Sequence, residues 1–209
     1  MIAELQTAIG VLKLVPEAIQ VGKDIWDKIV PPKEIDPVDN KEGVVGDTFF
    51  SENKKFAISI PSDNWNFWKP SPQFLASMGY IFAVPSRSMP IMIMSKSVIK
   101  LFRPNVNVVV EDVGDYTNIE EMMIVSRLML QNQCVTVNDG DIVIDSDKQC
   151  GQLIYYQQYM NSKLVSVQNC YLNDGMFYTI TACYVPMSDF SDKLFGGLQE
   201  IMNSFKLLS

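Results

Sequence analysis

The sequence predicts an α+β domain in which helices flank a central antiparallel β-sheet, preceded by an N-terminal helical arm. Three long strand-like segments follow one another at Cys150–Tyr159, Lys163–Tyr171 and Met176–Tyr184. Consecutive strands joined by tight turns pair in antiparallel fashion. Apolar residues occur on both alternating faces of these segments, which favours helices on both sides of the sheet, an αβα arrangement. Thr117–Asn132 and Ser191–Asn203 have the amphipathic pattern of those helices.

Residues 1–30 predict the amphipathic arm, because apolar residues recur there at helical spacing. Pro16 divides the arm into two pieces, about 2–14 and 16–30, since proline cannot continue a helix without a kink. The arm could fold back on its own domain or pack on another subunit or partner. The apolar positions are Ile2, Leu5, Ile9, Leu12, Ile19, either Ile25 or Trp26, and Ile29.

Residues 31–46 begin with two prolines and read as a linker, and residues 47–209 form the main domain. From Asp47 onward the apolar pattern changes to the two-residue period of strands. The shorter elements that we expect are strands at Thr48–Ser51, Lys55–Ile60, Tyr80–Val84, Ile91–Ser95, Val106–Val113, Cys134–Val137 and Ile142–Asp145, and a short helix at Gln73–Met78.

The segment Thr117–Asn132 is the strongest predicted helix. Thr117 can cap its first turn, and Glu120 stands three residues later as in a capping box. Its apolar side is expected to consist of Met122, Ile124, Val125, Leu128 and Met129. In the last predicted helix, capped by Ser191 or Asp189, Gly196 and Gly197 each cost about 1 kcal/mol relative to alanine.

The composition excludes several functional classes. The chain of 209 residues is 47% apolar and 20% charged, which is typical of a globular protein. A net charge of −7 disfavours nucleic acid as a partner, because like charges repel. The sequence contains no histidine, so Ser-His-Asp catalysis, Cys-His catalysis and His-ligated zinc are excluded. These features argue against an enzyme and indicate no cofactor.

The four cysteines are separated too widely for a zinc or redox motif, since none forms a C-x-x-C pair. Buried free thiols in a reducing compartment and disulfides in an oxidising one both remain open. The cysteines are Cys134, Cys150, Cys170 and Cys183.

No segment reaches the roughly 20 apolar residues that a membrane-spanning helix needs. The first residues also lack the basic start of a signal peptide, and Glu4, Lys13 and Glu17 interrupt the apolar stretch. The expected location is therefore the cytoplasm, or outside it if a leader has been removed.

Six segments, taken in order, resemble the PsbP/DcrB-like superfamily. They are Phe56–Pro61 followed by Trp65, Asn105–Asp112, Gly151–Tyr155, Val167–Gln168, Asp174–Ala182 and Ile201–Lys206. The resemblance covers about residues 47–209 and implies a PsbP-like fold. Members bind other proteins and often assist assembly, as Ran-binding proteins and secretion-effector chaperones do. This chain lacks the cysteine expected near the N-terminus of lipoprotein members, and it lacks histidines.

The candidate contact residues are aromatic or apolar. Trp65, Phe67 and Trp68 lie within four residues, so at least one ring is expected to be exposed as a partner anchor. The arm residues Leu5, Ile9, Leu12, Ile19 and Trp26 are the second candidate set.

Two other groups have simpler explanations. Met92 and Met94 alternate on one strand face and could bind a soft metal ion, form a contact surface or pack in the core. Asp139, Asp141, Asp145 and Asp147 lack the spacing of a calcium loop and read as a solvated turn.

The sequence thus favours a non-enzymatic, protein-binding adaptor or assembly chaperone. The partner is expected to be another protein, with self-association through the N-terminal helices as one route. The alternative is a small-ligand or metal-binding module that uses Met92, Met94 and nearby aromatic residues.

Overall fold

The computed structural model describes residues 43–52, 55–71, 87–100, 102–114, 118–132, 136–159, 161–186 and 192–208. Within these ranges the chain forms two antiparallel sheets, two α-helices and one short 3-10 turn, η1 (Asp139–Asp141). The predicted arm (1–30), the predicted helix at 73–78 and the strand expected at 80–84 lie outside them.

The larger sheet has seven strands in the order β4-β5-β6-β10-β9-β8-β7. The three long C-terminal strands predicted from the sequence are confirmed as β8, β9 and β10, and they pair in antiparallel fashion. The strands are β4 (Trp65–Trp68), β5 (Arg87–Ser95), β6 (Asn105–Asp112), β7 (Ile142–Asp145), β8 (Cys150–Tyr159), β9 (Ser162–Asn173) and β10 (Met176–Tyr184).

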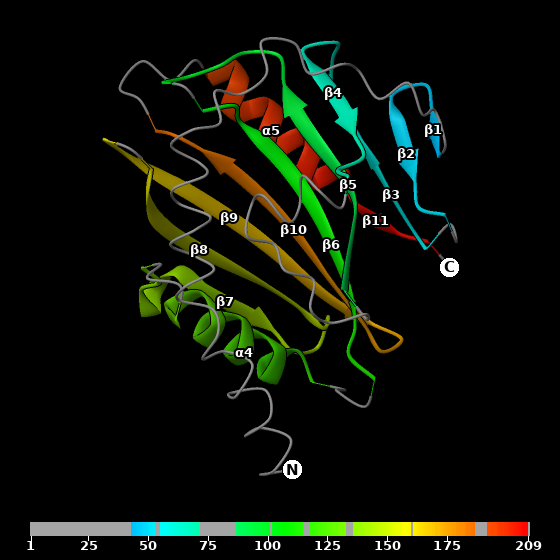
Figure 1. Cartoon of the computed structure of the whole chain (residues 1–209). Helices are drawn as coiled ribbons and strands as arrows, with labels where there is room; N and C mark the ends of the chain where they lie inside the picture. The colour runs from blue at the N-terminus through cyan, green and yellow to red at the C-terminus, as the bar shows by residue number, and fades with distance from the viewer. Residues whose placement is uncertain are drawn as a thin grey trace. The chain divides into compact units, whose positions relative to one another are not determined.

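A second, four-stranded sheet has the order β1-β2-β3-β11. Its strands are short: β1 (Val44–Val45), β2 (Thr48–Phe50), β3 (Phe56–Ser59) and β11 (Lys206–Leu207). Strand β11 pairs with β3, so the C-terminal segment completes a sheet that begins near residue 44 (Figure 1).

The main core joins both sheets to helix α5 (Asp192–Ser204). Phe56 of β3, Tyr178 of β10 and Phe205 after α5 form an aromatic cluster at its centre. The ring centroids of Phe56 and Phe205 lie 5.4 Å apart, and that of Tyr178 lies 6.1 Å from each. Such tilted and edge-to-face contacts favour a fixed arrangement of the rings.

The predicted αβα arrangement is wrong. The described chain is mainly β-structure, and each short helix covers only part of a sheet: α5 contacts β3, β6 and β10, and α4 (Ile119–Asn132) contacts β7, β8 and β9. Much of the apolar face that the sequence assigned to helices instead packs on the second sheet, through Phe49, Phe56 and Ile58.

Helix α4 begins differently from the prediction. Thr117 lies outside the described residues, and the side-chain oxygen of Asn118 accepts a hydrogen bond of 2.7 Å from the backbone N–H of Glu120. The Glu120 carboxylate accepts a hydrogen bond of 2.6 Å from the hydroxyl of Ser146, in the turn between β7 and β8. These contacts place the first turn of α4 beside that turn.

The end of α5 is docked on the second sheet. The hydroxyl of Ser204 accepts a hydrogen bond of 2.8 Å from the backbone N–H of Ser59, while Phe205 is buried in the main core.

The two adjacent glycines of α5 should respond oppositely to alanine. At Gly197 an added Cβ would lie 2.9 Å from the indole nitrogen of Trp65, whereas at Gly196 it would meet nothing within 4 Å. We expect Gly196→Ala to stabilise the protein by about 0.5–1 kcal/mol through helix propensity. Gly197→Ala should destabilise it by about 1–3 kcal/mol through overpacking. Urea unfolding measures both, and equal stabilisation by the two substitutions would contradict the close packing of Trp65 on α5.

Candidate protein-interaction surface

Helix α4 carries apolar residues on two opposite sides. On the inner side Ile119, Met122 and Met123 are buried against Leu153 and Phe177 of the seven-stranded sheet. This contact supplies the one apolar face that an amphipathic helix needs to dock.

The opposite side of α4 exposes three further apolar residues. Ile124 is 57% exposed, Val125 38% and Leu128 54%. At 100° per residue these positions centre on the side of the helix opposite Ile119. Single exposed apolar residues are ordinary, but three on one helix face form a patch of the kind that marks interaction sites. We call Ile124, Val125 and Leu128 the outer stripe.

Polar residues limit the outer stripe at both ends. Glu120 and Glu121 are exposed in the first turn of α4, and Gln131 and Asn132 are exposed in its last turn. The stripe therefore runs from two carboxylates, across apolar side chains, to two amides.

Strand β7 contacts α4 and, among the strands that the structure describes, forms one edge of the seven-stranded sheet beside β8 (Figure 1). Val143 is 64% exposed and Ile144 37% exposed, and neighbouring residues of a strand point to opposite faces. Edge strands present unpaired backbone groups to which another chain can bind. Ile144 stands opposite Gly151, against which Met123 of α4 packs, so Ile144 lies on the face of the sheet that α4 covers and Val143 lies on the other face. We call the outer stripe and this edge, with Val143 and Ile144 on its two faces, the interaction surface.

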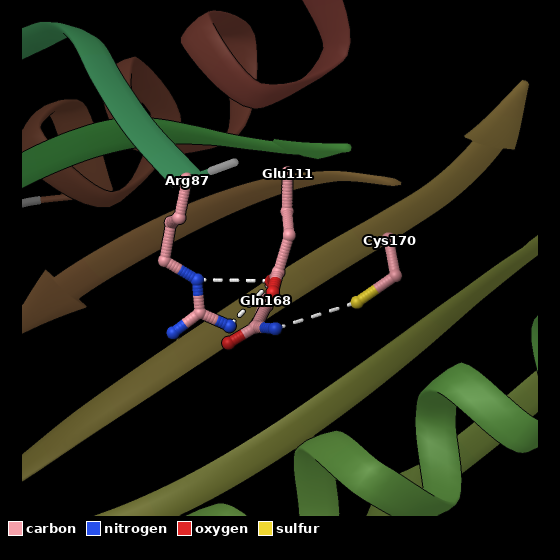
Figure 2. A network of polar contacts seen from close by, with 4 residues as sticks. All are labelled: Arg87, Glu111, Gln168 and Cys170. Atoms are coloured by element: carbon pink, nitrogen blue, oxygen red, sulfur yellow. Dashed lines mark hydrogen bonds and ion pairs between the residues drawn. The ribbon is translucent and has the colours of Figure 1, made fainter. Parts of the chain in front are cut away.

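Buried polar side chains lie on the face of the sheet that α4 partly covers. Thr181 of β10 stands opposite Asn107 of β6 and Gln168 of β9, and Gln168 stands opposite Leu153, which contacts α4. Asn107, Gln168 and Thr181 are each less than a tenth exposed. The amide of Gln168 donates a hydrogen bond of 3.4 Å to the sulfur of Cys170 (Figure 2).

An ion pair joins β5 to β6 on the same face. The Nε atom of Arg87 lies 2.9 Å from Oε2 of Glu111, and its Nη2 atom contacts the same oxygen (Figure 2). The two residues stand opposite each other in the strand register, so the pair connects the strands directly. Opposite charges across neighbouring strands stabilise a sheet.

The thiols of Cys170, which is buried, and Cys183, which is half-buried, are poor nucleophiles. Burial raises the pKa of Cys170 to about 12 and that of Cys183 to about 11, although the hydrogen bond of each thiol, with Gln168 and with Ser166, lowers its pKa. Only the thiolate attacks electrophiles, and both groups stay protonated near neutral pH. The three described cysteines, Cys150, Cys170 and Cys183, are free, and Cys134 lies outside the described residues.

The structure describes only some of the predicted contact residues. Trp65 and Phe67 are buried in the main core, and Trp68 is half-buried. The predicted exposure therefore concerns Trp68, whose role in binding stays a prediction. The arm residues Leu5, Ile9, Leu12, Ile19 and Trp26 lie outside the described ranges. Met92 is buried opposite Trp68 and Asn107, and Met94 is half-buried.

The apolar side predicted for α4 is wrong. The prediction grouped Met122 with Ile124, Val125, Leu128 and Met129, but Met122 is buried and Ile124, Val125 and Leu128 are exposed. The signal was present, because Ile119, Met123 and Leu130 together with Met122 already complete one apolar face. Ile124, Val125 and Leu128 therefore had no place on that buried face of α4.

Among the residues whose placement the structure gives, no three His, Cys, Asp or Glu side chains gather as metal ligands. Among the same residues, neither helix has the length and apolar character needed to cross a bilayer.

No protein-family profile matches the chain. No curated protein matches it either. Among solved structures, it is similar to that of cyanobacterial PsbP (CyanoP) from Synechocystis sp. PCC 6803, at 12% identity and a TM-score of 0.50, over 79% of this chain and 96% of that one. This similarity shows that the chain has a PsbP-like fold, which confirms the fold that the motifs implied.

Two further similar structures have lower scores. LpqN, involved in cell envelope biogenesis of Mycobacterium tuberculosis, aligns at 11% identity and a TM-score of 0.42, over 80% of this chain and 87% of that one. A protein from Bacteroides thetaiotaomicron aligns at 13% identity and a TM-score of 0.46, over 79% of this chain and 50% of that one.

The thiol of Cys170 should resist alkylation in the folded protein. With a pKa of about 12 it carries thiolate at a fraction of roughly 10⁻⁴ at pH 8, and it is fully buried. We expect peptide mass spectrometry to find Cys170 unmodified by iodoacetamide at pH 8, and fully modified after unfolding in guanidinium chloride. Rapid modification of Cys170 in the native protein would contradict its burial under α4.

Proposed function

We propose that this protein is a non-enzymatic, protein-binding adaptor and that it binds through the interaction surface. The observation that carries this proposal is the outer stripe: α4 already has a buried apolar face, and it exposes Ile124, Val125 and Leu128 on the other.

The outer stripe offers a substantial gain in free energy to a partner. Fully burying an aliphatic side chain is worth about 1.5–3 kcal/mol. Ile124 and Leu128 are more than half exposed and lie one helical turn apart, so one partner element could cover both. Val143 and Ile144 extend the apolar character to the adjacent sheet edge.

The ionisable and nucleophilic side chains of this protein also support binding rather than catalysis. The sequence offers no histidine as a general base near neutral pH. Cys170 and Cys183 remain protonated thiols, and the guanidinium of Arg87 is engaged by Glu111. The PsbP-like fold supplies the scaffold, while the function depends on the surface that this chain builds on it.

Site-specific photo-crosslinking tests this proposal. A photoreactive amino acid replaces Leu128 or, in a separate variant, Val143, and each protein is irradiated in its native cell. We expect covalent adducts with a different protein from at least one of these positions, because both side chains are exposed on the interaction surface.

The matched control carries the same amino acid at Val45, which is 70% exposed on β1 of the other sheet. Adducts that are equally frequent at Val45, or adducts at none of the positions, would show that the interaction surface does not bind another protein.

A further inference from the structure

We propose that a second copy of this chain binds the outer stripe, with the two α4 helices packed antiparallel about a two-fold axis. This inference rests on the proposed function, because it names an occupant for the α4 part of the same interaction surface. It leaves Val143 and Ile144 of the sheet edge for a different protein.

The order of residues along α4 has the symmetry that such an interface requires. In a two-fold dimer the same patch lies on both subunits, so the patch must complement itself. Ile124 and Leu128 stand two residues on either side of Ser126. The exposed pairs Glu120–Glu121 and Gln131–Asn132 stand five and six residues on either side of the same point.

An antiparallel pairing brings unlike groups together. The carboxylates of Glu120 and Glu121 then face the amides of Gln131 and Asn132 in the other copy, and an amide N–H donates well to a carboxylate. A parallel pairing would instead oppose carboxylate to carboxylate. The last turn of α4 contains no basic residue, so no competing ion pair forms within the helix there.

The predicted dimer is weak. Stable interfaces bury about 1,600 Å² in total, and a contact based on one helix per subunit falls below this, so we expect a dissociation constant of micromolar order or weaker. Each copy also carries a net charge of −7, which opposes association. Salt screens that repulsion, so dimerisation should strengthen as ionic strength rises. A different protein that placed basic residues opposite Glu120 and Glu121 would show the reverse dependence, because salt would weaken its binding.

Sedimentation velocity of the full chain, over about 1–300 µM at low and high salt, measures the association. We expect the mass to rise with concentration from 23.6 kDa toward twice that value. Leu128→Glu should weaken the dimer at least about tenfold by burying a charge. Val45→Glu, which adds the same charge at an exposed site on β1, should leave it unchanged.

A second pair of variants tests the antiparallel geometry. Asn132→Lys puts a cation opposite the carboxylates of the other copy, so it should tighten the dimer about threefold to tenfold. Asn203→Lys makes the same change in charge at an exposed position near the end of α5 and should have little effect. Both lysine variants should remain folded, since cations favour helix C-termini.

A chain that sediments as a monomer at every concentration, or equal effects of the two lysine variants, would overturn this inference. If the chain is monomeric while Leu128 or Val143 crosslinks to a different protein, the inference fails and the proposed function stands. Adducts of Leu128 with a second copy, together with concentration-dependent dimerisation, would support the inference.

Discussion

The contact among Phe56, Tyr178 and Phe205 is the interaction on which the described fold depends. Each ring comes from a different part of the chain: a strand of the small sheet, a central strand of the large sheet, and the residue after α5. The small sheet has strands of two to four residues, too short to be stable alone. Its order therefore depends on burying Phe49, Phe56 and Ile58 in a core that it shares with the large sheet.

The parts of this fold that were predictable from the sequence are those governed by local patterns. The three long strands were recognisable because each runs for nine or more residues and ends at a polar turn. The arrangement of layers was not, because an apolar strand face is satisfied equally well by a helix or by another sheet. The pairing of β11 with β3 joins residues about 150 positions apart, and two residues of strand carry no periodic signal. The aromatic cluster at Trp65–Trp68 likewise gave no indication of which rings would be buried.

Helix α4 has more apolar residues than its contact with the sheet can bury, and only the three-dimensional structure reveals which of them remain exposed. In sequence, its aliphatic residues form one nearly continuous run, and periodicity favours a single apolar side. In the structure, Ile119, Met122 and Met123 fill the contact with the sheet, so no place remains there for Ile124 and Leu128. The helix thus combines a structural face with a face that stabilises nothing within the described residues. The buried thiol of Cys170 packs in the same cluster as this helix, and the Arg87–Glu111 pair joins β5 to β6 elsewhere on that face of the sheet.

The pairing of β11 with β3 also constrains the order in which the protein can fold. The hydrogen bond between Ser59 and Ser204 spans 145 residues, and contacts of such high sequence separation form late and slowly. During synthesis, Phe56 and Ile58 emerge well before α5 and Phe205, with which they share the core. The nascent chain must therefore carry exposed aromatic strands until α5 and Phe205 have been translated, and general chaperones matter most during that interval.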